Sequence, residues 1–472
     1  MTSNFQLTKH PVGSLREIWT MSWPLMLSLV SNSLMLFVDR LLLSWHSPLA
    51  LAAGANASMA YYLFLVVPMA ICAISEVFVG RLHGEGKTQE IGKPVWQTVW
   101  FAFMLAVPLW LISAYLPDIV FYRTGNQENE VIYFQMLMGF SPLMCASIAF
   151  SGFFIGIGKV KVVTWCTVCA NCLNAVGGYL LIFGWGPIPA LGVVGAGLAT
   201  GLAQSLQMVL LLLCFLSKRN RKKYGTSDFA FHRTYFKDAL RIGAPAGTGH
   251  LVEIFAHFIF FRIVMMAGPQ HMAIAAIVQS FYLLFGFIVD AQSKGVGAIV
   301  ANLIGAKEFG LISKVFKAAI LQHTLFSIAL LGLIVTFLDL FLGSFFSGDG
   351  ANWLEDPILY QMASQAMLWM CLFFLFDGFC WILIGNLTAS GDTKFIFYVS
   401  SLVNWVAYVL PVFLLVGLGG HGADAAWMII AFYSMINFGI YFWRYRSGRW
   451  LQYTSFGRSS SGLEAVLPVE NR

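Results

Sequence analysis

The stretch Ser217–Arg241, SKRNRKKYGTSDFAFHRTYFKDALR, is nearly the only long polar run in the sequence. It is rich in Lys and Arg, and it divides the chain into two hydrophobic parts. About six apolar segments precede it and about six follow it, each with the roughly 20 residues that a helix needs to cross a membrane. We therefore interpret this stretch as a connector between two halves of a membrane protein.

The composition excludes a soluble fold. Of the 472 residues, 58% are hydrophobic and 11% are charged, and the mean hydropathy is +0.75. A soluble fold of this size cannot cover so much apolar surface. The apolar runs are long and contain Gly and Pro, whereas a transmembrane barrel requires short alternating strands. The expected fold class is an all-α polytopic membrane protein embedded in the lipid bilayer.

Twelve transmembrane helices are predicted from the hydrophobic runs. They cover residues 15–45, 52–80, 94–117, 131–157, 162–184, 192–216, 239–267, 272–303, 311–343, 358–388, 394–418 and 422–446. The predicted organisation is a cytoplasmic segment 1–14, an N-lobe 15–216, a basic cytoplasmic connector 217–238, a C-lobe 239–446 and a polar, disordered cytoplasmic tail 447–472.

The charges of the loops alternate from one predicted crossing to the next. Loops on one side hold the connector and the basic residues Arg81, Lys87, Lys93, Lys159, Lys161, Lys307, Lys314, Lys317 and Lys394. Loops on the other side are neutral or acidic, with Asp118, Glu128, Glu130, Asp349, Glu355 and Asp356. Cytoplasmic loops carry an excess of positive charge, so both termini are expected in the cytoplasm, in a protein of the cell inner (plasma) membrane. This topology explains the net charge of +6 without a nucleic-acid partner.

The two halves repeat one another in outline. Pro24 matches Pro245, and the segment Gly80–Lys87 matches Ala301–Glu308, at an offset of about 221 residues. After an insertion near Gly348–Pro357 the offset grows to about 233. Six spans per half give both copies the same orientation. An axis along the membrane normal is therefore expected to relate them, with the binding site between the halves.

The strongest candidates among the acidic residues inside the predicted spans are Asp39, Glu253 and Asp377. A charged side chain at the centre of a membrane helix costs about 2.5 to 3.5 kcal/mol, so each one requires a partner, water or a function. The alternative is a permanent ion pair, with Arg40 for Asp39 and Arg262 for Glu253. Adjacent residues on a helix point about 100° apart, so Arg40 is poorly placed to neutralise Asp39. The three acids are therefore candidate functional residues.

Two histidines accompany Glu253 on its predicted helix. His250, Glu253 and His257 share one helical face, which permits a metal site. Their spacing differs from that of the zinc-protease helix, in which the Glu directly follows the first of two His four residues apart. We favour His250 and His257 as hydrogen-bonding partners or proton relays for Glu253.

Other charged residues in the spans leave alternatives open. Glu76 lies near the cytoplasmic end of its span, where it is either a snorkelling interfacial group or a functional acid. Asp290 and Lys294 are four residues apart on one predicted helix, so we expect them to form an ion pair within the membrane.

The sequence resembles the multidrug and toxic compound extrusion (MATE) transporters, most of all their NorM-type branch, over nearly all of residues 15–446. The resemblance is carried by Pro24 followed by the FVD that ends at Asp39, by Pro245 followed eight positions later by Glu253, and by Asp377 followed eight positions later by Gly385 and then SGDTKF. It implies twelve helices in two pseudo-symmetric six-helix lobes, with a central cavity that opens alternately to each side. It also implies a cation site at Glu253 and Asp377 in the C-lobe and a place for Asp39 in the N-lobe cavity.

The sequence also departs from known branches of this family. In the DinF-type branch an Asp stands four residues after the Asn of the fifth helix, whereas here Asn174 is followed at that spacing by Gly178. This difference argues against an N-lobe proton site of that kind. Asp290 and Lys294 are not part of the expected NorM-type pattern, and the histidines beside Glu253 leave the choice between sodium and protons open.

The expected function is that of a cation-coupled multidrug antiporter that exports small organic cations by alternating access. The coupling ion, Na⁺ or H⁺, is expected at Asp39, Glu253 and Asp377, and neither a cofactor, a structural metal nor a catalytic residue is expected in this monomer. Binding of the organic cation and of the coupling ion to the same carboxylates would be competitive. The predicted substrate cavity is lined by Asn32, Asn174, Phe281, Tyr282, Asp290, Trp381 and Trp405, whose aromatic members permit cation–π contacts.

Two other functions are compatible with parts of this pattern. A lipid-linked glycan or polysaccharide flippase of a related family would bind an anionic diphosphate and should line its cavity with Arg and Lys. The spans offer only Arg40, Arg262 and Lys294, which favours cationic cargo. A membrane-embedded hydrolase would use His250, Glu253 and His257 as metal ligands, and stoichiometric zinc would distinguish it.

Overall fold

The computed structural model describes residues 6–121, 125–187, 189–346 and 356–454, and these residues form helices, turns and short connections without an extended strand. Twelve helices within them are long and apolar enough to cross a membrane. The predicted all-α polytopic fold with twelve spans is therefore confirmed. The predicted insertion near Gly348–Pro357, with Asp349 and Glu355, lies largely outside the described residues.

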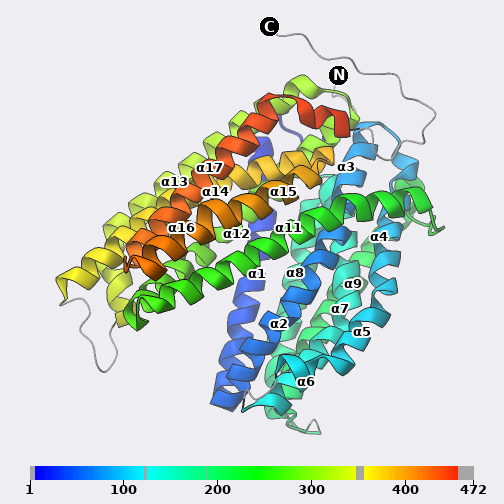
Figure 1. Ribbon diagram of the computed structural model, residues 1–472. Helices are drawn as coiled ribbons and strands as arrows, with labels where there is room; N and C mark the ends of the chain where they lie inside the picture. The colour runs from blue at the N-terminus through cyan, green and yellow to red at the C-terminus, as the bar shows by residue number, and fades with distance from the viewer. Residues whose placement is uncertain (1–5, 122–124, 188, 347–355, 455–472) are drawn as a thin grey trace.

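The N-lobe contains the first six spans (Figure 1). Its elements are α1 (Leu15–His46), α2 (Pro48–Ala73), α3 (Ser75–Gly84), η1 (Thr88–Glu90), α4 (Gly92–Met104), α5 (Ala106–Tyr115), α6 (Pro117–Val120), α7 (Gln127–Gly156), α8 (Val160–Phe183) and α9 (Gly192–Phe215). One span combines α2 with α3, and another combines η1, α4 and α5. The first span begins at a side-chain cap, because the hydroxyl of Ser14 accepts a hydrogen bond from the backbone N–H of Glu17.

The C-lobe follows the short helix α10 (Lys218–Tyr224) and contains the other six spans. Its elements are α11 (Arg233–Met266), α12 (Pro269–Gly305), α13 (Phe309–Phe346), α14 (Pro357–Ser390), α15 (Thr393–Val403), η3 (Asn404–Val409), α16 (Leu410–Val412), η4 (Phe413–Leu418), α17 (Ala423–Arg446) and η5 (Arg449–Tyr453). The span from α15 to η4 includes two stretches of π-helix. At the start of α14, Asp356 caps the helix by accepting hydrogen bonds from the N–H groups of Ile358 and Leu359.

The connector ends earlier than predicted. α11 begins at Arg233, inside the predicted connector 217–238, because its first turns bury Ala239 and Ile242 while their Lys and Arg side chains stay exposed. A search for continuous apolar runs does not detect such an amphipathic start. Part of the remaining connector is also helical, since α10 buries Asn220 and Tyr224 on one face.

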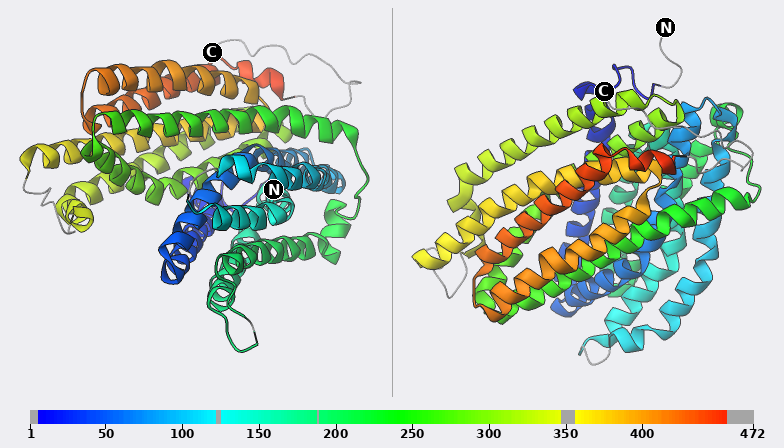
Figure 2. Two further views of the ribbon diagram at one scale, coloured as in Figure 1. Left: turned by 60° about the horizontal axis from the view of Figure 1, so that its bottom comes forward. Right: turned by 45° about the horizontal axis from the view of Figure 1, so that its top comes forward.

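The two lobes converge at the end of the molecule where the connector lies, and they separate toward the opposite end (Figures 1 and 2). We call the converging end the connector end. There α2 packs along α11, and α1 packs along α12. Glycines allow these helices to approach closely, because Gly247 of α11 lies against the backbone of Val67 and Gly295 of α12 lies against Ser22.

The backbones of α3 and α12 touch where they cross at the connector end. A Cβ atom at Gly84 would collide with the backbone oxygen of Asn302, and one at Gly305 would collide with the backbone oxygen of Arg81. The repeat relates these two contacts, because an offset of about 221 residues takes Gly84 to Gly305 and Arg81 to Asn302. Equivalent patches that contact each other reciprocally are typical of a two-fold interface. The crossing thus supports the expected axis between the halves.

Arg81 also joins the lobes at this end. Its guanidinium group donates hydrogen bonds of 3.1 and 2.7 Å to the backbone oxygen of Ala389, in the last turn of α14. A third bond of 2.8 Å reaches the backbone oxygen of Thr454. The segment before Thr454 forms η5 and buries Trp450, so the start of the tail is structured, contrary to our expectation for residues 447–472. The apolar side chain of Trp450 explains the difference, and residues 455–472 lie outside the described chain.

The connector is anchored to the N-lobe along its length. Gln89 donates to the backbone oxygen of Lys222, Trp96 to that of Thr226 and Trp100 to that of Phe229. Gln97 donates to the backbone oxygen of Ala230 and accepts from the N–H of His232. The residues between α9 and α11 therefore follow the surface of η1 and α4.

We expect replacement of Arg444 by Ala to destabilise the C-lobe. Arg444 Nε lies 2.8 Å from Asp392 Oδ2, and the two side chains are 9% and 1% exposed. The variant leaves a buried carboxylate without its partner, so the free energy of unfolding should fall by about 3–5 kcal/mol. Thermal unfolding of the purified protein in detergent measures this as a lower midpoint. Arg446→Ala, at an exposed position of the same helix, is the control, and an equal decrease in both variants would contradict the prediction.

Candidate functional site

Two of the three predicted acids lie close together in the C-lobe. Glu253 on α11 and Asp377 on α14 are within electrostatic reach of each other. The hydroxyl of Tyr282 on α12 donates a hydrogen bond of 2.7 Å to Asp377 Oδ2. Trp381, one turn after Asp377, packs edge-on against the ring of His250, with 5.7 Å between the ring centroids. Three helices thus bring two carboxylates, a phenol and an indole into one cluster.

The two histidines of α11 contact Glu253 in different ways. His250 Nδ1 lies 3.2 Å from Glu253 Oε2, whereas His257 Nδ1 lies 3.1 Å from the backbone oxygen of Glu253. The ring of His257 packs edge-on against Tyr408. Across the described ranges, no group of three or more His, Cys, Asp or Glu residues could hold a metal ion. The geometry gives the carboxylate one imidazole partner, His250.

Asp39 forms a separate polar cluster inside the N-lobe. The hydroxyl of Thr200 on α9 donates to Asp39 Oδ2 at 3.4 Å, and the amide of Asn174 on α8 donates to that hydroxyl at 3.2 Å. Asn174 Oδ1 is buried and has no hydrogen-bond partner among the described residues. A Cβ atom at Gly178 would lie 3.2 Å from Leu42 Cδ1 and 3.9 Å from Asp39 Oδ1, so the backbone of α8 approaches α1 closely beside the carboxylate. Carboxylate, hydroxyl and amide oxygens from three helices are suitable ligands for a hard cation.

Neither Asp39 nor Asp377 forms an ion pair in the part of the chain that the structure describes, and Glu253 pairs only with His250. Arg40 and Arg262, the partners that the alternative interpretation requires, are exposed. Asp39 is 5% exposed and Asp377 is 7% exposed, so water does not fully compensate their charges. The three acids are therefore not neutralised by Arg or Lys.

Further charged residues lie where the two lobes face each other. Tyr62 of α2 is 41% exposed and is within electrostatic reach of Asp290 and Glu253 in the other lobe. On α12, Lys294 Nζ lies 3.6 Å from Asp290 Oδ2, which confirms the predicted i, i+4 ion pair. We call the space bounded by Tyr62, Glu253, Asp290 and Lys294 the interlobe space. The side chains of Asp290 and Lys294 there are 47% and 43% exposed.

The remaining residues of the predicted cavity lie in different environments. Asn32 on α1 is exposed and accepts a hydrogen bond of 3.0 Å from Asn171 on α8. Phe281 is buried and packs against Phe341 of α13, with 5.1 Å between the ring centroids. Trp405 in η3 is 44% exposed. Of the predicted aromatic residues, Tyr282 and Trp381 contact members of the C-lobe cluster directly, whereas Phe281 occupies the position of a packing residue.

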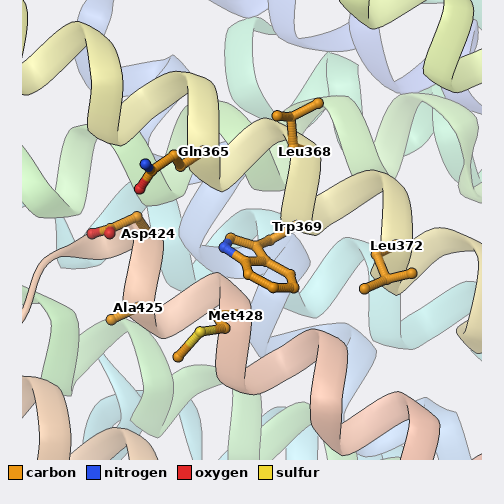
Figure 3. Close-up of a pocket in the computed structure, with 7 residues that line it drawn as sticks. All are labelled: Gln365, Leu368, Trp369, Leu372, Asp424, Ala425 and Met428. Atoms are coloured by element: carbon orange, nitrogen blue, oxygen red, sulfur yellow. The ribbon is translucent and has the colours of Figure 1, made fainter.

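A groove of about 490 Å³ lies between α14 and α17, on a different part of the C-lobe (Figure 3). It is lined by Gln365, Leu368, Trp369, Leu372, Asp424, Ala425 and Met428. None of the three acids lines this groove. It is therefore distinct from the two acid clusters, which are the C-lobe cluster of Glu253 and Asp377 and the N-lobe cluster of Asp39.

Sequence reasoning missed three residues that the structure places beside the acids. Thr200 lies in an apolar, Gly-rich run and Tyr62 in an aromatic one, and neither has a distinguishing signal. His323 of α13 had one, since it is a polar residue inside a predicted span. Its Nε2 lies 3.0 Å from the backbone oxygen of Phe374, one turn before Asp377, and its Nδ1 lies 2.9 Å from Gln292 Oε1. His323 thereby holds the α14 segment that carries Asp377.

Two six-helix lobes with acids in their interiors and on their facing surfaces are typical of a membrane transporter. The sequence model of the MatE family matches residues 24–180 and 245–413, with one match in each lobe. These matches cover well over half of the chain, and the chain belongs to the MatE family. The predicted resemblance is confirmed.

Known relatives and solved structures agree with this assignment. The chain is 22% identical over 464 residues to the uncharacterized transporter YisQ of Bacillus subtilis, covering 94% of this chain and 97% of the relative. It is 24% identical over 428 residues to the probable multidrug resistance protein NorM of Streptococcus pneumoniae serotype 4, covering 89% and 92%. A solved structure described as the outward-facing conformation of a multidrug resistance MATE family transporter superposes with a TM-score of 0.83 at 16% identity, covering 97% of this chain and 100% of the other. This likeness confirms the fold.

Proposed function

We propose that this MatE-family transporter exports small organic cations in exchange for sodium ions or protons that flow inward. The observation that carries the proposal is the burial of Asp39 and Asp377 without an Arg or Lys partner in the described chain. A buried carboxylate without a cation is costly. Such a residue is useful where a cation binds and leaves during each cycle.

The C-lobe cluster is the proposed site of the coupling ion, and Asp39 provides a second carboxylate in the N-lobe. Tyr282 orients Asp377, and His250 is close enough to Glu253 to exchange a proton with it. An organic cation and a coupling ion both stabilise the ionised carboxylates, and they repel each other at short distance. Binding of one therefore weakens binding of the other, which couples the two flows.

The arrangement of the lobes corresponds to one state of an alternating-access cycle. The contacts of α3 with α12 close the connector end, and the lobes separate at the other end. We place the connector end in the cytoplasm, with both termini, because its loops hold most of the Lys and Arg residues. With the connector end closed on the cytoplasmic side, the lobes of this state open to the outside. We also infer that the protein acts as a monomer in the plasma membrane. Moving one charge across that membrane supplies about 2.3 kcal/mol per 100 mV.

The names of the relatives support drug-like organic compounds as cargo, since the matched NorM proteins are named as probable multidrug resistance proteins. The charge of the interlobe space favours cations among such compounds. A flippase for anionic lipid-linked glycans requires free positive charge there, whereas the cation that the structure places in this space, Lys294, is paired with Asp290. The observations therefore favour export of cations over the flippase alternative.

Purified protein in liposomes is expected to transport a fluorescent organic cation only when an ion gradient is imposed. Sodium and pH gradients are applied separately, and the gradient that drives transport identifies the coupling ion. An ionophore that collapses this gradient should stop transport, and Glu253→Gln protein in the same liposomes should remain inactive. Equal transport with and without either gradient would refute coupled exchange.

A further inference from the structure

Lys294 occupies an unusual position on α12. Every residue from Ala291 to Gly305 is buried except Lys294, whose side chain is 43% exposed. A lysine on a membrane helix is costly unless it is paired or solvated. Lys294 is paired with Asp290, whose side chain is 47% exposed and within electrostatic reach of Tyr62 in the other lobe. The ammonium group therefore projects into the interlobe space.

A second acid approaches Lys294 from the N-lobe. Glu76 of α3 packs against α12, because a Cβ atom at Gly297 would lie 3.9 Å from Glu76 Oε1. Gly297 follows Lys294 by about one helical turn, and Glu76 and Lys294 are within electrostatic reach of each other. The lysine thus lies between Asp290 of the C-lobe and Glu76 of the N-lobe. The carboxylate of Glu76 is therefore directed at the other lobe.

We propose that Lys294 is a tethered cation that occupies the acidic end of the interlobe space in the absence of cargo, and that an organic cation must displace it from Asp290 in order to bind. This inference rests on the proposed function, because it assumes cationic cargo. It adds a specificity-determining residue that lies outside the two acid clusters.

The chemistry of lysine suits this role. Its ammonium group is a compact charge on a flexible four-carbon chain, so it can leave Asp290 without movement of α12. A bound organic cation repels the ammonium group and takes over its interaction with the carboxylate. When the cargo leaves, Lys294 returns, and Asp290 is not left without a partner. Lys294 therefore lowers the affinity for cations and favours their release.

The test compares Lys294→Gln, Lys294→Arg and the wild type in detergent, with the dissociation constant of a fluorescent monovalent organic cation as the readout. An uncharged analogue of the same shape is measured in parallel. Removing the tethered charge should tighten binding of the cation about fivefold and leave binding of the analogue unchanged. Lys294→Arg keeps the charge and should retain the affinity of the wild type. Lys317→Gln, which removes an exposed charge from α13, controls for net charge.

Each outcome of this test has a distinct meaning. An unchanged cation affinity in Lys294→Gln would overturn the inference, and so would an equal gain for the uncharged analogue, because that gain would be steric. A gain in Lys294→Arg that equals the gain in Lys294→Gln would overturn it as well. Failure of the wild type to bind any organic cation would instead refute the proposed function.

Discussion

Asp377→Asn is expected to reduce gradient-driven transport of organic cations to the level of protein-free liposomes, while the protein still inserts into the membrane. The amide keeps the shape of the side chain and can still accept the hydrogen bond from Tyr282. It cannot carry the negative charge for which the cargo and the coupling ion compete. The variant should therefore fold normally and lose coupling, as measured by uptake in proteoliposomes and by elution of the purified protein in size-exclusion chromatography.

Asp424→Asn provides the matched control for this experiment. Asp424 lies on α17 in the same lobe, but it lines the groove between α14 and α17 and belongs to neither acid cluster. This variant should transport at the rate of the wild type. Normal transport by Asp377→Asn would contradict the proposed role of the C-lobe cluster, whereas loss of transport in both variants would show that the lobe does not tolerate such changes.

Gly84→Leu is expected to prevent closure of the connector end and thereby to stop transport. A side chain at Gly84 would collide with the backbone oxygen of Asn302, which cannot move aside as a flexible side chain can. The helices α3 and α12 would then remain apart, and the outward-open state would be lost. Spin labels at Lys222 and Lys394, one exposed position on each lobe, report this change as a longer distance, in a background without the eight native cysteines.

Gly310→Leu is the control for the helix crossing. Gly310 lies near the start of α13, and a Cβ atom there would meet no atom within 4 Å. The variant introduces the same side chain without a collision, so the distance between the labels and the transport rate should match those of the wild type. An unchanged distance in Gly84→Leu would show that the crossing of α3 and α12 does not control closure.

Long-range organisation was predictable from the sequence because it depends on features that act over whole segments. Apolar length predicted the twelve spans. The repeat of Gly80–Lys87 in Ala301–Glu308 predicted an axis between the halves, and the reciprocal contacts of α3 and α12 agree with it. Asp39 and Asp377 were recognised because a charge within an apolar run is costly. The sequence also indicated the pair of Asp290 and Lys294 through its helical spacing.

The partners of these acids were not predictable in the same way. The hydrogen bond from Thr200 to Asp39 joins α9 to α1, and nothing in a single sequence records which faces of two distant helices meet. The same holds for Glu76, whose carboxylate reaches α12 in the other lobe. The start of α11 at Arg233 was missed because its polar first turns are amphipathic rather than apolar. Contacts between individual side chains of distant helices therefore cannot be predicted from patterns that describe whole segments.

The anchoring of the connector has a mechanical consequence for the transport cycle. From Lys222 to His232 the chain is bonded to η1 and α4, so this segment must travel with the N-lobe. α11 begins at the next residue and belongs to the C-lobe. The first turns of α11 nevertheless pack on the N-lobe as well, since the ring of Tyr235 lies edge-on against Phe78 and that of Phe236 against Phe101. Relative movement of the lobes must therefore either bend α11 or separate its first turns from α3 and α4.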